Sequence, residues 1–353
     1  MLNVRPIKTT SEQERFCAVA GLSTLTPGAL ERSRADAHWI VDGDDGILAR
    51  CSLWWSCVPQ LASQRIGLIG HYAAYDDEAA VSLLRLACKE LARQGCTLAV
   101  GPMDGSTDRR YRLLSERGTE PPFFLEPDNP DDWPHHFMNS GFTPLAHYYS
   151  ALQVGLEPQS SPTGPRVVVR PTGMTSGPRK GGDPMRLEFV AGGITLRQFD
   201  LERFEDELHR IYGLVVSSFR DNFLASPLAE EDFLEQNRAL RPYIRPELIQ
   251  LAEREGEIIG FIFAVPDWLQ MRRGATIDTI VIKTLAVHPT YRGKGLGTLL
   301  MNRLLKIAHG LGYQRAIHAL MHENNYSLRI SRGKRGEVMR RYTLYAQSLE
   351  EQQ

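Results

Sequence analysis

Three glycines alternate with other residues in the segment YRGKGLGTLL, at positions 293, 295 and 297. Because glycine adopts positive φ without a steric penalty, the N–H groups of such a loop can converge on one point. The apolar residues that follow predict a helix over about 297–310, whose first N–H groups are unpaired and whose dipole is positive at that end. The segment therefore predicts a binding site for a phosphate group.

Side chains within the loop add to this predicted site. Arg292 and Lys294 supply positive charge, and Thr298 supplies a hydroxyl donor. The loop matches neither the dinucleotide fingerprint G-x-G-x-x-G nor the P-loop pattern G-x-x-x-x-G-K-[ST]. Without its flanks, the loop is equally compatible with a glycine-rich turn that binds nothing.

With its flanks, the segment LAVHPTYRGKGLG closely resembles the signature of the GNAT acetyltransferase superfamily, [QR]-x-x-G-x-[GA], which Arg292, Gly295 and Gly297 match. An apolar strand precedes the segment and an apolar helix follows it, as in that family. The resemblance implies that residues 188–353 form a catalytic domain that binds acetyl-CoA as its co-substrate.

The resemblance also implies where acetyl-CoA would bind. The glycine loop would hold the pyrophosphate, and the backbone of the preceding strand would pair with the pantetheine arm. An asparagine after the next strand often contacts the cofactor in that family, and the segment NNYS offers Asn324. The implied cofactor-binding residues are Leu285, Ala286, Val287, Arg292, Gly293, Lys294, Gly295, Leu296, Gly297, Thr298 and Asn324.

The implied reaction is direct attack of a primary amine, belonging to a small molecule or a peptide, on the thioester of acetyl-CoA. Such a reaction needs a proton acceptor, donors for the oxyanion and an acid for the departing thiolate. The N–H of Val287 is a candidate oxyanion donor. A non-catalytic acyl-CoA-binding module that serves in regulation is the alternative function.

Candidate acids and bases are few. Ser331 stands where that family often has a tyrosine, and the strand TIVIKTLAV has no carboxylate. His318 and His322 are candidate bases, because they lie on one face of a predicted strand and histidine titrates near neutral pH. Tyr326 is a candidate acid. For each of these three residues the alternative is a purely structural or surface role.

The elements that position these residues follow from sequence periodicity. In the second half, the pattern predicts a strand at 193–200, a helix at 201–219, a hairpin turning at Glu255 and Gly256, a long strand at 276–289 and a strand at 313–322. The first half repeats this order, with a hairpin at 37–55, a strand at 65–76, a helix at 77–95 and strands at 96–103 and within 131–152. The fold class is therefore mixed α/β with a mixed sheet, arranged as two tandem GNAT-like domains.

We divide the chain into a degenerate GNAT-like domain at 1–152, a linker rich in Pro, Gly and Ser at 153–187, and the catalytic domain at 188–353. At the place of the glycine loop, the first half has Asp76, Asp77 and Glu78, which would repel a pyrophosphate. We expect this half to support the second domain and to wall the acceptor site. Its loops 101–114 and 124–137 are candidates for that wall, with Trp133 and Phe123 as pocket residues.

Composition limits the remaining possibilities. The formal net charge is -1, and no apolar run approaches the length of a membrane span, so we expect a cytoplasmic protein without a membrane or nucleic-acid partner. Nucleic-acid binding through the basic segment RISRGKRGEVMRR is the third and weakest hypothesis. The cysteines lack metal-ligand spacing, so we expect reduced thiols and no metal. The oligomeric state is left open.

Overall fold

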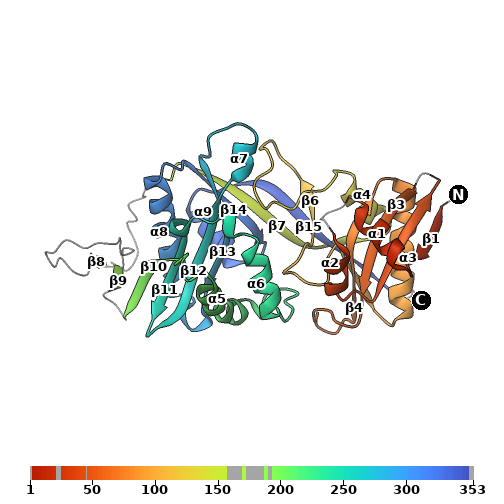
Figure 1. Cartoon of the computed structure of the whole chain (residues 1–353), viewed down its shortest axis with the longest axis horizontal. Helices are drawn as coiled ribbons and strands as arrows, with labels where there is room; N and C mark the ends of the chain where they lie inside the picture. The colour runs from red at the N-terminus through yellow and green to blue at the C-terminus, as the bar shows by residue number, and fades with distance from the viewer. Residues whose placement is uncertain are drawn as a thin grey trace.

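The computed structural model describes residues 2–20, 25–44, 46–156, 169–171, 187–189 and 193–349, and it shows an elongated molecule (Figure 1). The first half begins with a strand and two helices, continues with a hairpin, and then alternates strands and helices. Its elements are β1 (Asn3–Pro6), α1 (Thr10–Ala18), α2 (Pro27–Arg32), β2 (Ala37–Gly43), β3 (Gly46–Trp54), β4 (Ile66–Ala74), α3 (Asp77–Arg93), β5 (Leu98–Gly101), β6 (Leu113–Glu116), α4 (Trp133–Asn139) and β7 (Thr143–Val154).

The second half repeats the order of strand, helix, hairpin, strand, helix and strand. Its strands are β8 (Val169–Pro171), β9 (Leu187–Phe189), β10 (Ile194–Gln198), β11 (Ile249–Arg254), β12 (Glu257–Pro266), β13 (Thr279–Val287), β14 (Arg315–His322) and β15 (Glu337–Ser348). Its helices are α5 (Phe204–Phe219), α6 (Glu230–Arg238), α7 (Trp268–Arg272), α8 (Leu296–Gly310) and α9 (Tyr326–Gly333), with single 3-10 turns η1 (Arg241–Tyr243), η2 (Pro246–Leu248) and η3 (Pro289–Tyr291).

The predicted hairpin between β11 and β12 turns at Glu255 and Gly256. Both residues have positive φ, of 54° and 87°, as a two-residue turn between twisted strands requires. This match extends to the other elements predicted from periodicity, and the mixed α/β class is confirmed. Neither β6 nor β15 was predicted.

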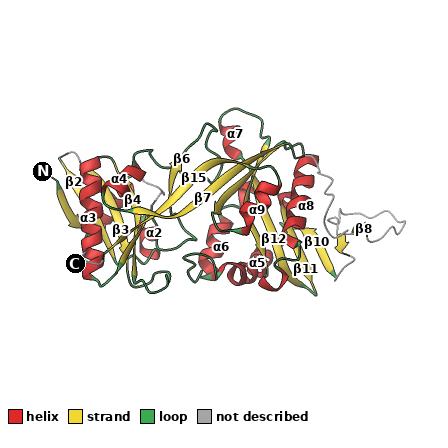
Figure 2. Ribbon diagram, turned by 180° about the vertical axis from the view of Figure 1, so that it is seen from behind, coloured by secondary structure: helices red, strands yellow, loops and turns green. Residues whose placement is uncertain are grey.

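One sheet runs through the described part of the chain, in the order β1-β2-β3-β4-β5-β15-β7-β14-β13-β12-β11-β10-β9-β8, and β6 also pairs with β15. Two long strands join its halves (Figure 2). β7, from the first half, pairs with β14 as well as β15, and β15 pairs with β5 as well as β7. Each half thus completes its sheet with a strand that the other half supplies.

Separate hydrophobic cores support the two ends of the sheet. In the first half, Leu83 and Leu91 of α3 are fully buried in the core that α3 forms with β3 and β4. In the second half, Leu300 and Leu304 of α8 pack in a core on one face of β12 and β13, while Ile211 of α5 packs in another core on the opposite face. Helices on both faces hold β13 in place, which positions the site described below.

The predicted division at residues 152 and 188 does not separate two sheets. Residue 152 falls inside β7, and the segment 188–353 includes β15, which lies beside β5 of the first half. Most of the predicted linker 153–187 lies outside the described residues. Periodicity predicts where strands occur but not which strands pair, so the exchange of β7 and β15 was not foreseen.

The basic segment that ends the second half is structured. Residues 329–341 form the last part of α9, a turn and the first part of β15. Arg340 is 1% exposed, and its Nε donates to Oε1 of Glu126 at 3.0 Å. At least this charge is neutralised inside the protein, which weakens the hypothesis of a basic surface for nucleic acid.

The cysteines and the helices of the described residues bear on two further expectations. All five cysteines are free, and Cys51, Cys88 and Cys96 are buried, as expected for reduced structural thiols. None of the helices described has both the length and the apolar character needed to cross a lipid bilayer.

Candidate active site

β13 and β14 run side by side only at their start. Thr279 to Ile282 pair in parallel with Arg315 to His318. Beyond this point β13 remains paired with β12, while β14 remains paired with β7 as far as His322. The two strands therefore diverge, and within the described sheet the edge of β13 from Lys283 onward has no partner strand.

The backbone groups on this open edge can be identified. The N–H of His288 donates to the carbonyl of Ile259, in β12, at 2.9 Å. Because successive peptide groups of a strand point to alternate sides, the N–H groups of Leu285 and Val287 point away from β12 and into the gap. The peptide groups of Ala286 point toward β12 instead, so the expected backbone role in cofactor binding fits Leu285 and Val287 but not Ala286.

The glycine loop leads from η3 into α8. Gly295 is the N-cap of α8 with φ of 82°, in the left-handed region, and Gly293 has φ of 73°. No side chain caps this helix, so its first-turn N–H groups are available to a ligand. A Cβ on Gly295 would meet no atom within 4 Å, which shows open space beside the loop. This is the geometry expected of an anion site.

The basic residues of the loop differ in their placement. Arg292 lines the cavity described next, and its guanidinium donates to the carbonyl of Ser218 near the end of α5. Lys294 lies with its Nζ 5.4 Å from the ring centre of Tyr291 and is not among the cavity-lining residues. Arg292 therefore fixes the loop against α5 as well as adding charge to it.

A cavity of about 1550 Å³ joins the glycine loop to the gap between β13 and β14. The second half contributes α5, β12, β13, β14 and the first turn of α8, and the first half contributes residues 107–109, Tyr111, Arg112, Leu125 and Tyr148. The predicted cofactor residues that line it are Leu285, Ala286, Val287, Arg292, Gly293, Gly295, Leu296, Gly297, Thr298 and Asn324. The three predicted catalytic residues, His318, His322 and Tyr326, line it as well.

His318 is almost fully enclosed, with 3% of its surface exposed. Its Nε2 lies 3.2 Å from Oε1 of Gln153, a side-chain acceptor on β7. Burial, together with the positive charge of Lys334, lowers the pKa of His318 to about 4. A neutral, hydrogen-bonded imidazole is the structural role that was the alternative for this residue, and so low a pKa makes it a weak base.

His322 is better placed than His318 for a role in the site, but as a hydrogen-bond donor and not as a base. Its Nδ1 accepts the N–H of Asn324 at 3.1 Å, which leaves the proton of the neutral ring on Nε2. Nε2 is buried and has no hydrogen-bond partner in the described part of the chain. Burial lowers the pKa of His322, so the ring is held in its neutral form. His322 therefore offers an N–H, and not the lone pair that the predicted base requires.

The residues that follow β14 have different roles. Asn325, and not Asn324, is the N-cap of α9, where its side chain accepts the N–H of Ser327 at 3.3 Å. Asn324 is thus free of the capping role and lines the cavity. Tyr326 is 61% exposed at the start of α9. Ser331 is fully buried and lies away from the cavity lining, so it does not replace the missing acid.

Lys283 and Arg112 are among the cationic residues that line the same cavity and were not predicted as site residues. Lys283 lies at the point where β13 leaves β14, and its Nζ donates to the carbonyl of Leu125 at 3.1 Å. Arg112, from the first half, is 5% exposed and stacks on the rings of Tyr111 and Tyr148, at 4.0 and 4.2 Å. The loop that contains Arg112 had been singled out by its polar, glycine-rich sequence, whereas nothing local to Lys283 signals its surroundings.

The first half lacks a comparable anion site at the corresponding place. The N-terminus of α3 is capped by Asp76, whose side chain accepts the N–H of Ala79 at 2.7 Å, and Asp77 and Glu78 follow in its first turn. These groups occupy and neutralise the helix end that is open in α8. The expected pocket role of Trp133 and Phe123 is wrong, because both are buried in hydrophobic cores at 2% and 1% exposure.

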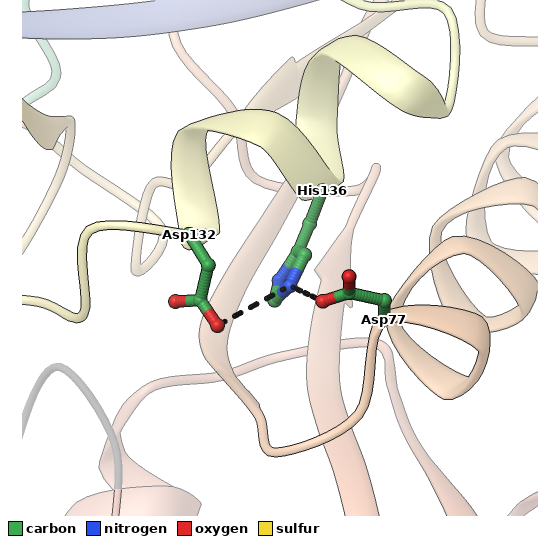
Figure 3. A group of neighbouring side chains, drawn as sticks. All are labelled: Asp77, Asp132 and His136. Carbon is green, nitrogen blue, oxygen red and sulfur yellow. Dashed lines mark hydrogen bonds and ion pairs between the residues drawn. The ribbon is translucent and has the colours of Figure 1, made fainter.

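A polar cluster in the first half brings together Asp77, Asp132 and His136 (Figure 3). Both nitrogens of His136 are engaged: Nε2 lies 2.9 Å from Oδ1 of Asp77, and Nδ1 lies 2.9 Å from the hydroxyl of Tyr72. These hydrogen bonds connect α4 to the start of α3 and to β4. They account for the arrangement as a structural link between the three elements.

Comparisons with protein families, known proteins and solved structures find several that this chain resembles. Residues 191–330 match the sequence model of the Acetyltransferase (GNAT) family. Over 99% of its length the chain is 23% identical to a protein described as a bacterial ceramide synthase from Caulobacter vibrioides, of which the match covers 98%. The fold is also similar to that of a GCN5-related N-acetyltransferase from Anabaena variabilis and of a probable N-acyltransferase from Enterococcus faecalis, each with a TM-score of 0.53. These two are 8% and 10% identical to the chain, and each match covers 99% of this chain and 73% of the other.

Residues 191–330 thus match the GNAT family, and β13, the glycine loop and α8 lie within the matched region. The first half repeats the order of elements, so the fold is the tandem GNAT-like arrangement that the sequence resemblance predicted. The site lies in the second copy, and the first copy supplies part of its wall.

Proposed function

We propose that this protein transfers an acyl group from acyl-CoA to the primary amine of an acceptor with a long apolar chain. One observation carries the proposal: a single cavity includes the open edge of β13, the uncapped N-terminus of α8 and an apolar surface of α5. These three surfaces suit, in the same order, the thioester arm of acyl-CoA, its phosphate groups and an apolar acceptor.

The donor side is supported by the backbone. The glycine loop and the first turn of α8 suit the pyrophosphate, and the N–H groups of Leu285 and Val287 suit the amides of a pantetheine arm. Acetyl-CoA, the donor expected from the sequence, is the smallest acyl-CoA that the site would take. The cavity exceeds the roughly 300–1000 Å³ of ordinary small-molecule sites, so longer acyl groups also have room.

The acceptor side is supported by the apolar lining and by the relative described as a ceramide synthase. A ceramide is a long-chain amino alcohol with a fatty acyl group on its nitrogen. Apolar side chains that line the cavity here include Phe199, Leu208, Ile211, Val215, Phe261 and Phe263. Burial of an alkyl chain against such residues is worth about 0.8 kcal/mol per CH₂. This favours a long-chain amine over the peptide that the sequence left open.

The residues at the gap suit the requirements of direct attack. The N–H of Leu285 or Val287 is oriented to stabilise the oxyanion, and the N–H at Nε2 of His322 is a second donor. As a neutral ring, His322 donates without giving up its proton. The backbone and His322 therefore stabilise charge, while proton transfer requires another group.

The test is turnover with defined substrates. The purified full chain is incubated with acetyl-CoA or palmitoyl-CoA and with either sphinganine or ethanolamine, and free CoA and the N-acyl product are measured. We expect release of CoA and formation of the amide with sphinganine and at least one donor, and little with ethanolamine. Binding of acyl-CoA by calorimetry without turnover on any amine would instead favour the non-catalytic acyl-CoA-binding module.

A pair of glycine variants tests the loop. Gly295→Ala places a side chain at φ of 82° in the loop, and Gly274→Ala imposes similar strain at φ of 79° outside the cavity. We expect only Gly295→Ala to weaken acyl-CoA binding, on the order of tenfold or more, because it disturbs the N–H groups that hold phosphate. Equal binding by both variants would mean that the loop is only a turn.

A further inference from the structure

Lys283 occupies a special point of the sheet. It is the first residue of β13 beyond the pairing with β14, and the register of β13 with β12 shifts at the same place, since Phe263 faces Thr284 while Ala264 faces Ile282. Lys283 is therefore a bulged residue, and bulges re-aim side chains. Its side chain lines the cavity at the apex of the gap.

No carboxylate pairs with Lys283 among the described residues. Its Nζ donates a hydrogen bond to a neutral group, the carbonyl of Leu125. Among the described residues, the two carboxylates that line the cavity interact with groups other than Lys283. Asp221 pairs with Arg220 at 3.6 Å, and the charges of Arg109 and Asp232 act on Asp108. An ammonium group in this position lacks the partner that would stabilise its charge.

Positive charges face Lys283 from the first half. The charged groups that act on it are Arg112, Arg110 and Glu126, and the titratable groups of β14 in the same cavity are His318 and His322. The charge of Glu126 is largely neutralised, since it accepts hydrogen bonds from Nε of Arg340 at 3.0 Å and from the hydroxyl of Tyr342 at 2.7 Å. Burial, followed by the repulsion of Arg112 and Arg110, lowers the pKa of Lys283 to about 7.

Arg112 is built into the structure as a fixed cation. Its guanidinium lies against the rings of both Tyr111 and Tyr148, and its Nε and Nη1 are buried without a hydrogen-bond partner among the described residues. The faces of aromatic rings stabilise a cation without cancelling its charge, as a carboxylate would. The field of Arg112 therefore persists inside the cavity.

We propose that Lys283 is the proton acceptor of the acyl transfer and that Arg112, contributed by the first half of the chain, holds Lys283 in its uncharged form. Lys283 would be a catalytic residue, and Arg112 a positioning residue that acts through it. This inference rests on the proposed function and adds to it the group that receives the proton.

The proposed acyl transfer begins when the nitrogen of the neutral acceptor amine forms a bond to the thioester carbon. This gives a tetrahedral species with a positive nitrogen and an oxyanion. Nζ of Lys283 takes one proton from that nitrogen. The C–S bond then breaks, the thiolate of CoA leaves, and the carbonyl of the amide forms. The ammonium of Lys283 returns its proton to the thiolate or to water and is ready for the next cycle.

The first experiment measures the protonation of Lys283 without relying on activity. Lysines of the full chain are labelled competitively with a trace of acetic anhydride between pH 5 and 10, and each site is quantified by proteolysis and mass spectrometry. We expect Lys283 to gain reactivity with a midpoint near 7, and the labelling of the exposed residues Lys8 and Lys306 serves as the internal reference.

Three arginine variants test the origin of this behaviour. Arg112→Met removes the cation and should shift the labelling midpoint of Lys283 upward, while Arg112→Lys keeps the charge and should leave it low. Arg341→Met removes a similar contact, in which the guanidinium lies 5.1 Å from the ring of Tyr149 outside this cavity, and should have no effect. A midpoint for Lys283 near that of an ordinary lysine, about 10.4, would overturn the inference.

The second experiment follows turnover on the acceptor found above. In the wild type, kcat should rise with pH to a plateau above about 7, and Arg112→Met should move this rise upward. Lys283→Arg retains an N–H donor for the carbonyl of Leu125 but stays protonated and cannot act as a base, so it should lower kcat by 10²-fold or more with unchanged binding of acyl-CoA.

These outcomes separate the two proposals. A low labelling midpoint with no turnover on any amine means that the proposed function has failed, and the catalytic role of Lys283 falls with it. Turnover that Lys283→Arg retains means that the proposed function stands and that Lys283 is not the base.

Discussion

His318 illustrates how the interior sets the charge of a single side chain. Its pKa is lowered to about 4 by burial and by Lys334, whereas an unfolded histidine titrates near 6.5. Between these two values the unfolded chain binds the proton and the folded chain does not. The unfolding free energy contributed by this residue is therefore lost as the pH falls from about 6.5 toward 4.

We predict that His318→Gln reduces the acid sensitivity of the protein. Between pH 7 and pH 5 the wild type should lose about 2 kcal/mol of unfolding free energy through His318, and the variant should not. Urea denaturation at the two pH values measures this difference. His135→Gln, which replaces an exposed histidine, is the control and should keep the full loss. An equal loss in both variants would contradict the argument.

At the scale of elements, the neighbouring residues Asn324 and Asn325 separate structure from binding. Both residues line the cavity, but the side chain of Asn325 also caps α9, whereas that of Asn324 does not. We predict that Asn325→Ala lowers stability by about 1 kcal/mol, the usual cost of losing an N-cap, and changes acyl-CoA affinity little.

The matched variant Asn324→Ala should show the reverse, with weaker acyl-CoA binding and unchanged stability. Thermal unfolding and calorimetric titration with desulfo-CoA distinguish the two effects. If Asn325→Ala weakened binding more than Asn324→Ala, the asparagine that contacts the cofactor would have been assigned to the wrong residue.

Elements also show what could be predicted from sequence. The glycine loop was found because its residues are contiguous and their chemistry is local, and β13 and α8 were found because their periodicities are clear. The donor role of His322 depends on a backbone N–H two residues away, which only the turn after β14 brings to Nδ1. The surroundings of Lys283 depend on Arg112, which is distant in sequence, so no local pattern reveals them.

For the whole molecule, the exchange of β7 and β15 makes the halves depend on each other. We predict that fragments 1–168 and 169–353 each fail to form a stable monomer, because the first lacks the strand between β5 and β7 and the second lacks the partner of β14. Mixed during refolding, they should form a one-to-one complex that binds acyl-CoA.

Size-exclusion chromatography with light scattering and hydrogen exchange of the β14 amides provide the readout. A monomeric fragment 169–353 with protected β14 amides and full acyl-CoA binding would show that the second half is self-sufficient. The sheet order would then overstate the contribution of the exchanged strands to stability.

The position of β15 also has a consequence for synthesis on the ribosome. β15 follows all the other described strands in sequence, yet it lies between β5 and β7, two strands that are made much earlier. The first half therefore waits with an incomplete sheet until β15 has been made. Because Arg112 and Tyr148 come from that half, a nascent chain that stops before β15 should be inactive even though its glycine loop and α8 have already been made.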